Sequence, residues 1–222
     1  MGITGLRETG MRTLFLAAIS AAAFAGLACA QDSEQRDLTG FDAVNAGGGY
    51  HLIVTVGEDW SVRLEGDAED FADLESSVIE GELRLRQHQR MFHRSRHLDV
   101  TVHVTLPAIS ELDFNRGIDA EASGIAADTL SVEVSTGASA TLTGTCGTGE
   151  FDLSTGSALN ARELICGTAE VEVSTGASAR IHADVSVRAR ASTGGAVTVH
   201  GSPSNRDARS SMGGSVRFNT AD

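Results

Sequence analysis

Residues 146–156 read Cys-Gly-Thr-Gly-Glu-Phe-Asp-Leu-Ser-Thr-Gly, and residues 166–176 read Cys-Gly-Thr-Ala-Glu-Val-Glu-Val-Ser-Thr-Gly. A Ser-Thr-Gly marker, or a close variant of it, recurs with glycines that are 20, 19, 20, 18 and 19 residues apart: Asn115-Arg-Gly117, Ser135-Thr-Gly137, Ser154-Thr-Gly156, Ser174-Thr-Gly176, Ser192-Thr-Gly194 and Ser211-Met-Gly213. A fixed period of this length is typical of stacked units, each too small to bury an apolar face alone.

The segments around each marker alternate apolar and polar residues. Glu150-Phe-Asp-Leu153 precedes one marker, and Ala179-Arg-Ile181 follows the next. A period of two indicates strands with one buried face. The glycine supplies the positive φ that a tight corner needs. We therefore expect two or three short strands per period of about 19 residues, joined by glycine corners, in an all-β parallel β-solenoid.

Two cysteines provide a test of this register. Cys146 and Cys166 occupy the same place in successive periods. Stacked strands lie about 4.8 Å apart, and the Cα atoms of a disulfide lie roughly 4.4–6.8 Å apart. A disulfide between neighbouring coils is therefore allowed, and two reduced, buried cysteines are the alternative.

The first thirty residues carry the signature of export. Arg12 precedes an apolar run that ends at Ala28-Cys-Ala30, as in a secretory signal peptide over 1–30. Cleavage after Ala30 gives a periplasmic or secreted protein, whereas lipidation of Cys29 would anchor it to a membrane. We expect a linker over 31–37 and one solenoid domain over 38–222, with irregular coils over 38–112 and regular rungs over 113–222.

The region before the markers also carries a family resemblance. Phe41-Asp-Ala-Val44 leads into a glycine-rich bend, Gly81-Glu-Leu-Arg-Leu85 forms a strand pattern, and Val104-Thr-Leu-Pro107 closes the next one. With the Ser-x-Gly rungs, these motifs resemble the head-GIN domain (auto-transporter adhesin) family over essentially all of residues 38–220. The resemblance implies a right-handed parallel β-helix in the bacterial envelope. The family has no established activity, and it more often shows Ser-Gly-Ala-Gly-like rungs where this chain has Ser-Thr-Gly.

The predicted register stacks carboxylates on the outer surface. Six of them form a candidate site for a cation or a basic partner: Asp113, Glu133, Asp152, Glu172, Glu150 and Glu170. Like charges about 4.8 Å apart repel each other. A solvated acidic stripe is one interpretation, and a ladder that binds Ca²⁺ or a basic partner is the other. Since no Asp-x-Asp-x-Asp-Gly loop is present, we expect no dedicated metal site or cofactor.

A basic segment interrupts this acidic chain, whose formal net charge is -13. It predicts a loop that could contact an anionic glycan through Arg84, Arg86, Arg90, Arg94 and Arg96. The acidic balance argues against nucleic acid as a partner.

A polysaccharide-acting enzyme is the alternative function, because stacked carboxylates match the spacing of retaining glycosidases. Against it, acid and nucleophile need different environments, and the repeats offer nearly identical ones. The sequence therefore favours a non-enzymatic, adhesin-like binding or structural module of the cell envelope, whose partner is an envelope or extracellular glycan or protein.

Overall fold

The computed structural model describes residues 32–88 and 97–219. The predicted signal peptide over 1–30, with Cys29, lies outside them. The described chain is all-β apart from one short helix, and it forms a parallel β-solenoid of about five turns. The predicted fold class is confirmed.

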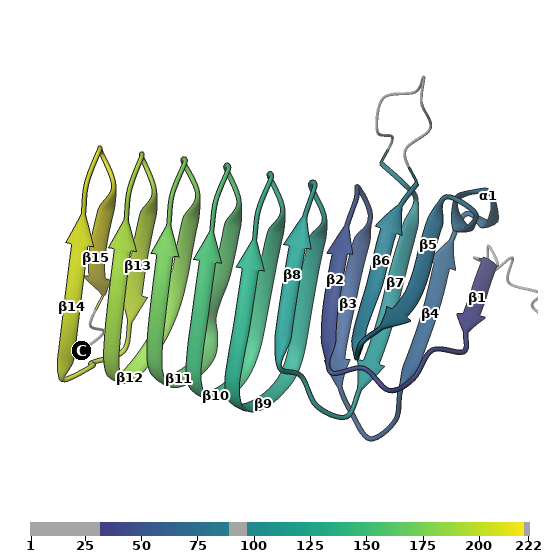
Figure 1. Cartoon of the computed structure of the whole chain (residues 1–222), viewed down its shortest axis with the longest axis horizontal. Helices are drawn as coiled ribbons and strands as arrows, with labels where there is room; N and C mark the ends of the chain where they lie inside the picture. Colours follow the sequence, from purple (N-terminus) through teal and green to yellow (C-terminus); the bar gives the residue numbers. More distant parts are fainter. Residues whose placement is uncertain (1–31, 89–96, 220–222) are drawn as a thin grey trace, which may run out of the picture. The chain divides into compact units, whose positions relative to one another are not determined.

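Each regular coil consists of one long strand that bends half-way and contributes to two sheet layers. Four such strands follow one another in sequence and in space: β9 (Asp119–Val134), β10 (Ser139–Leu153), β11 (Ala158–Val173) and β12 (Ser178–Ala191). Their first halves pair in parallel in a back layer, and their second halves pair in parallel in a front layer (Figure 1). The core lies between the two layers.

Shorter strands extend both layers. The back layer continues with β1 (Asp32–Arg36), β3 (His51–Val56), β4 (Ser61–Gly66), β7 (Val100–Leu106), β13 (Ala196–His200) and β15 (Ser215–Asn219). The front layer continues with β2 (Ala43–Gly47), β5 (Leu74–Ile79), β6 (Glu82–Gln87), β8 (Glu111–Asn115) and β14 (Asn205–Ser210). Among the described residues, antiparallel pairing is confined to the N-terminal end, where β1 pairs with β4, β4 with β7, and β5 with β6.

The N-terminal coils do not stack in chain order. β2 pairs with both β6 and β8, and β3 pairs with both β7 and β9. The coil made first in the sequence therefore lies between two later coils. This crossing accounts for the lack of a regular period over residues 38–112.

The Ser-Thr-Gly markers form the tight corners of the solenoid. At the first regular one, Ala138 donates a backbone hydrogen bond to the Ser135 carbonyl over 3.1 Å. Thr136 and Gly137 between them have φ values of 53° and 74°, so both central residues are left-handed, as in a type I′ turn. The Gly137 N–H then donates to the carbonyl of Thr155 on the next coil over 3.0 Å, which links successive corners.

The opposite edge differs from the prediction of short strands joined by glycine corners. There the chain stays in strand conformation and bends through irregular pairing, with a register shift between Thr141 and Thr143. A bulge of this kind bends a strand without ending it. Each regular coil thus has one tight corner and one bulged bend, which is why the long strands span 14–16 residues.

The alternation of each strand sends one set of side chains into the core. Leu112, Val132, Phe151, Val171 and Ala189 succeed one another in register on the front layer, and each is buried. Burial of such side chains contributes on the order of 1.5–3 kcal/mol for each large apolar group. The core therefore fixes which residues face outward.

The predicted disulfide is confirmed. Cys146 and Cys166 are register partners on β10 and β11, with Cα atoms 4.4 Å apart, and they form a disulfide. Both lie in the core, at 7% and 0% exposure. The covalent link therefore joins two neighbouring coils from inside.

The predicted linker over 31–37 is largely a strand. β1 pairs with β4 along its whole length. Arg36, at its end, donates to the carbonyl oxygens of Leu74 (2.6 Å) and Phe71 (3.0 Å), and thus ties β1 to β5 and to helix α1 (Ala68–Phe71). The sequence concealed this strand because its residues are polar and, up to Arg36, exposed, so it shows no apolar alternation.

Candidate functional site

The outer surface of the front layer carries the predicted carboxylates in register. Asp113 pairs with Glu133, Glu133 with Asp152, and Asp152 with Glu172. A second column beside the first runs through Glu111, Ser131, Glu150 and Glu170. We call the seven carboxylates of these two columns the acidic ladder. The strand pairing agrees with the register read from the sequence.

Arginines balance the charge at the C-terminal end of the ladder. Arg190 pairs in register with Glu172, and Arg188 with Glu170. The Arg190 guanidinium forms an ion pair with Glu172 and lies 3.4 Å from a Glu170 oxygen. Its hydrogen bond to Glu172 raises the pKa of Arg190. The carboxylates on β11 are therefore compensated.

The carboxylates nearer the middle of the ladder are not compensated. Within residues 32–88 and 97–219, no arginine or histidine side chain forms an ion pair with Glu133 or Asp152. Partial burial raises the pKa of Glu133, with added repulsion from Asp113 and Asp152. Partial burial likewise raises the pKa of Asp152, with repulsion from Glu172 and Glu150. The centre of the ladder holds negative charge at a cost in free energy.

The first column also continues towards the N-terminus, which the sequence did not reveal. Asn45 pairs in register with Asp113 on one side and with Arg84 on the other. Its amide donates to Asp113 Oδ2 over 2.7 Å. Arg84 therefore lies on the same face as the acidic ladder. Only the crossing of the coils brings it there, and no local pattern encodes that crossing.

The prediction of a basic loop is wrong for the two arginines that the structure describes. Arg84 and Arg86 lie on strand β6, paired with Asn45 and Gly47 of β2. The alternating Leu83 and Leu85 are fully buried, and this holds the segment in the sheet. The other three lie outside the described residues: Arg90, Arg94 and Arg96. A contact between this segment and an anionic glycan stays a prediction.

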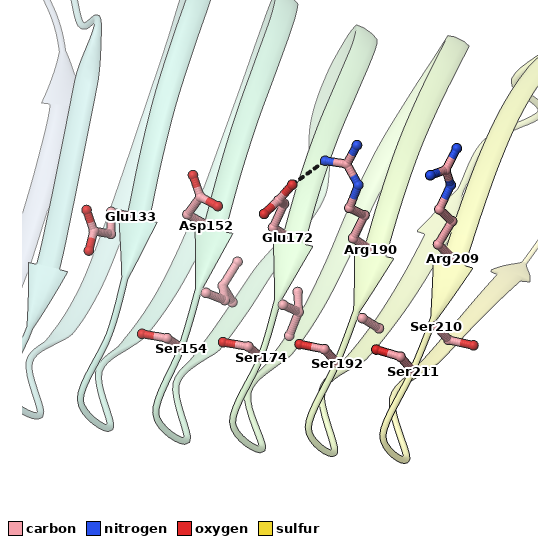
Figure 2. Close-up of a pocket in the computed structure, with 13 residues that line it drawn as sticks. Glu133, Asp152, Ser154, Glu172, Ser174, Arg190, Ser192, Arg209, Ser210 and Ser211 are labelled. Carbon is pink, nitrogen blue, oxygen red and sulfur yellow. Dashed lines mark hydrogen bonds and ion pairs between the residues drawn. The ribbon is translucent and has the colours of Figure 1, made fainter.

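A groove of about 490 Å³ runs along the front face at the C-terminal end of the ladder. One side carries the charged column and the other a column of marker serines (Figure 2). The charged residues are Glu133, Asp152, Glu172, Arg190 and Arg209, and the marker serines are Ser154, Ser174, Ser192 and Ser211. The groove thus follows the solenoid axis: the serine column repeats from coil to coil, whereas the charged column changes from acidic residues to arginines after Glu172.

The marker serines are a feature that the sequence reasoning underrated. Serine is common in turns, so the sequence alone gives no reason to place these side chains in a site. They do form corners, yet their side chains also face the groove (Figure 2). Their spacing from the charged column, two residues along each strand, could have given the signal, since alternate residues of a strand share one face.

The two central carboxyl groups of the groove, Glu133 and Asp152, lie in similar environments. Glu133 and Asp152 have equivalent places on neighbouring coils, and the pKa of each is raised by the same cause, burial followed by repulsion from carboxylates. Glycoside hydrolysis needs two carboxyl groups in contrasting environments. Glu133 and Asp152 do not show that contrast.

Two histidines form a short column on the back layer near the bulged edge. His182 pairs in register with His200, and His182 Nε2 lies 3.2 Å from Asp184 Oδ1. Partial burial, with nearby Arg162, lowers the pKa of His200. In the described part of the chain, no cluster of three or more histidine, cysteine, aspartate or glutamate side chains is arranged to hold a metal ion.

The described residues contain no helix with the length and apolar character needed to cross a bilayer.

Solved structures share this fold across most of the chain. A crystal structure described as a putative adhesin from Bacteroides fragilis NCTC 9343 is 15% identical, covers 86% of this chain and 97% of its own, and has a TM-score of 0.67. One described as a putative lipid binding protein from Parabacteroides distasonis ATCC 8503 is 13% identical, with coverages of 85% and 96% and a TM-score of 0.52. Another, described as a putative adhesin from Parabacteroides merdae ATCC 43184, is 12% identical, with the same coverages and a TM-score of 0.50. At such identities the likeness establishes the fold alone.

No curated protein matches the chain in sequence. The family model described as "Putative auto-transporter adhesin, head GIN domain" matches residues 40–203. That range includes the crossed N-terminal coils, the disulfide and most of the groove. The chain therefore belongs to the head-GIN domain family.

Proposed function

We propose that the protein is an exported, adhesin-like binding module of the bacterial cell envelope that holds its partner in the groove of the front face. The observation that carries the proposal is the groove itself, which presents the same pair of columns on successive coils. A linear site whose serines recur on successive coils suits an extended partner that makes the same hydrogen bonds several times. Membership of the head-GIN family supports an adhesin-like role.

The charge of the groove defines the chemistry of the partner. Glu133 and Asp152 have no cation beside them in the described part of the chain, and their pKa values are raised by partial burial first and by repulsion from neighbouring carboxylates second. A partner with a positively charged group relieves this repulsion when it binds. The serine hydroxyls opposite can both donate and accept hydrogen bonds. Beside Glu133 and Asp152 the partner therefore carries cationic groups, on either an amino-bearing glycan or a basic protein segment, whereas Arg190 and Arg209 line the other end of the same groove.

Binding of Ca²⁺ to the acidic ladder stays a separate prediction. Calcium takes six to eight oxygen ligands from several directions, whereas the ladder presents its carboxylates along one flat face. Thermal unfolding with and without millimolar Ca²⁺ distinguishes the two ideas. A rise in Tm with Ca²⁺ that disappears in Glu133→Gln would favour cation binding.

The experiment that tests the proposed function measures binding of the purified protein to two panels, amino-bearing glycans and short basic peptides. We expect one panel to bind, with affinity that falls as salt rises. The double variant Glu133→Gln, Asp152→Asn removes the uncompensated charge and is expected to weaken binding at least tenfold. The matched control is Glu121→Gln on the back layer, where the register partners are Ile53 and Thr141. Equal binding by the double variant and the wild type would contradict the proposal.

A further inference from the structure

Among the described residues, the coil formed by β14 and β15 lacks the cover that each earlier regular coil receives from its successor. In the back layer, Val197 and Val199 are 1% and 0% exposed, whereas their register partners on β15, Val216 and Phe218, are only half-buried. In the front layer, Ala189 is fully buried, whereas its partner Ala208 on β14 is exposed. In the part of the chain that the structure describes, the inner side of this coil is thus open.

The edges of this coil are open as well. Among the described residues, β14 pairs only with β12, and β15 pairs only with β13. These two strands end the solenoid at its yellow end in Figure 1. Half of the backbone N–H and C=O groups of such an edge strand are unpaired and are available to another strand. The N-terminal end also has edge strands, β1 and β5, each paired on one side only among the described residues, but β1 is polar and exposed up to Gln35 and leaves no apolar face open.

We propose that two copies of this chain associate end to end through this coil, with β14 of one copy antiparallel to β14 of the other. The axis of two-fold symmetry crosses both layers, so β15 also lies antiparallel to its counterpart. The association continues both sheets and covers both inner surfaces. The inference does not depend on the function proposed for the groove.

Among axes at the central residues Asp207, Ala208 and Arg209, the outward charges of β14 favour one register for this pairing. Asn205, Asp207 and Arg209 face outward, since they alternate with Ala208, whose partner Ala189 is buried. A two-fold axis at Asp207 would set that carboxylate against itself, and one at Arg209 would do the same to the guanidinium. An axis at Ala208 instead places each Asp207 opposite the partner copy's Arg209. Opposite charges across an antiparallel pair are favourable, and like charges are not.

The same axis also fits the inner side of the coil. The Arg206 guanidinium lies 4.9 Å from the centre of the Phe218 ring, so these two residues face each other across the two layers. The strands β14 and β15 run in opposite directions, so a step of two residues forward on β14 corresponds to a step of two residues back on β15. Ala208 therefore faces Val216. An axis through Ala208 therefore sets Val216 beside its own counterpart, and Arg217 beside Ser215 rather than beside another arginine.

Arg206 partly covers the inner side of the last coil in the single chain. Its Nε donates to the Pro203 carbonyl over 2.9 Å while the guanidinium covers Phe218. An inward-pointing charge of this kind discourages indiscriminate pairing of an edge. In the selected register Arg206 lies opposite the partner copy's Ser210, whose hydroxyl and carbonyl both accept hydrogen bonds. A two-fold contact uses up the open end of each chain, so the product is a closed dimer and not a fibre.

Charge reversal tests the register directly. We measure mass by light scattering after size exclusion for wild type, Asp207→Arg, Arg209→Asp and the double variant, over a wide range of concentration. The wild type is expected to dimerise, and each single variant is expected to dimerise at least tenfold more weakly because it sets like charges opposite each other. The double variant restores both opposite-charge pairs and is expected to dimerise again. An equimolar mixture of the two single variants is expected to form a heterodimer, since each supplies the charge that the other lacks.

Folding of every variant is checked by circular dichroism, because Asp207 also lies 3.8 Å from Arg188 and 3.3 Å from Arg209 within its own chain. Arg180→Asp, on the back layer of β12 and away from the open end, is the matched control and is expected to dimerise like the wild type. A wild type that stays monomeric at the highest concentration overturns the proposal. So do open-ended oligomers, or a mixture of single variants that does not form a heterodimer.

Discussion

Replacement of Glu133 by Gln is expected to stabilise the fold, because this side chain lies between two uncompensated carboxylates. Asp113 and Asp152 are its register partners on either side. Burial raises the pKa of Glu133, and repulsion from these two carboxylates raises it further. Gln keeps the shape and the capacity for hydrogen bonds while it removes the charge. The variant therefore isolates the repulsion within the acidic ladder.

The size of the effect follows from Coulomb's law. At a separation of about 4.8 Å in water, each like-charged neighbour costs about 0.9 kcal/mol. Two neighbours give roughly 1.7 kcal/mol, and solvent and salt screening of these exposed groups reduces the gain to about 0.5–1 kcal/mol. For a domain of this size, each kcal/mol corresponds to about 2–4 °C in Tm. We expect Tm to rise by about 1–4 °C at low salt.

The assay is thermal and urea unfolding, followed by circular dichroism and by the fluorescence of Trp60. Glu121→Gln is the control, since its register partners carry no charge. Its Tm is expected to change less than that of Glu133→Gln, and the difference is expected to shrink in 1 M salt. A Glu133→Gln protein no more stable than the wild type, with Glu121→Gln equally unaffected, would refute the reasoning.

The pH dependence gives an independent check on the sign. Because the pKa of Glu133 is raised in the folded protein, the folded state binds its proton more tightly than the unfolded chain does. Stability is then lost as the pH rises from the ordinary glutamate value through the raised one. The advantage of Glu133→Gln is therefore expected to be fully present near neutral pH and to vanish below that interval.

Three further predictions concern the scaffold. Replacement of both Cys146 and Cys166 by Ser is expected to lower the free energy of unfolding by about 3 kcal/mol, because the disulfide closes a loop of 20 residues, and unfolding in urea with and without reductant measures it. Thr155→Asn is expected to raise stability by about 0.5–1 kcal/mol, since Thr155 has a φ of 53° and Asn tolerates this conformation better than a β-branched residue. An unchanged or lower urea midpoint would contradict it. Gly144→Ala is expected to lower the free energy of unfolding by on the order of 2–3 kcal/mol, because Gly144 has a φ of 135° and a new Cβ there would collide with the Ile125 carbonyl. At Gly156 a new Cβ meets no atom within 4 Å, so Gly156→Ala is expected to cost less.

The sequence predicted those features that depend on local alternation and on the period. Glu133 and Asp152 could be placed in one column, and Cys146 beside Cys166, because each pair holds equivalent positions relative to a marker. Once the inward residues are fixed by burial, the outward residues follow. The column positions of the acidic ladder therefore needed no knowledge of the rest of the fold.

Features that depend on contacts between distant segments could not be predicted. Arg84 joins the front face only because β2 lies between β6 and β8, and no spacing in the sequence encodes that order. The strand character of residues 32–36 comes from pairing with β4, not from an apolar pattern of its own. The bulged edge was missed for a related reason, since a register shift is a property of two strands and not of one.

Because the coils stack, the length of the groove depends on the number of coils. Each regular coil contacts mainly its immediate neighbours and contributes one charged residue and one serine to the same two rows. Duplication of one period of about 20 residues would lengthen the groove by about 4.8 Å without changing its cross-section. Deletion would shorten it by the same step. The number of repeats in the gene would thus set how long a stretch of partner the protein can hold, independently of how tightly each unit is held.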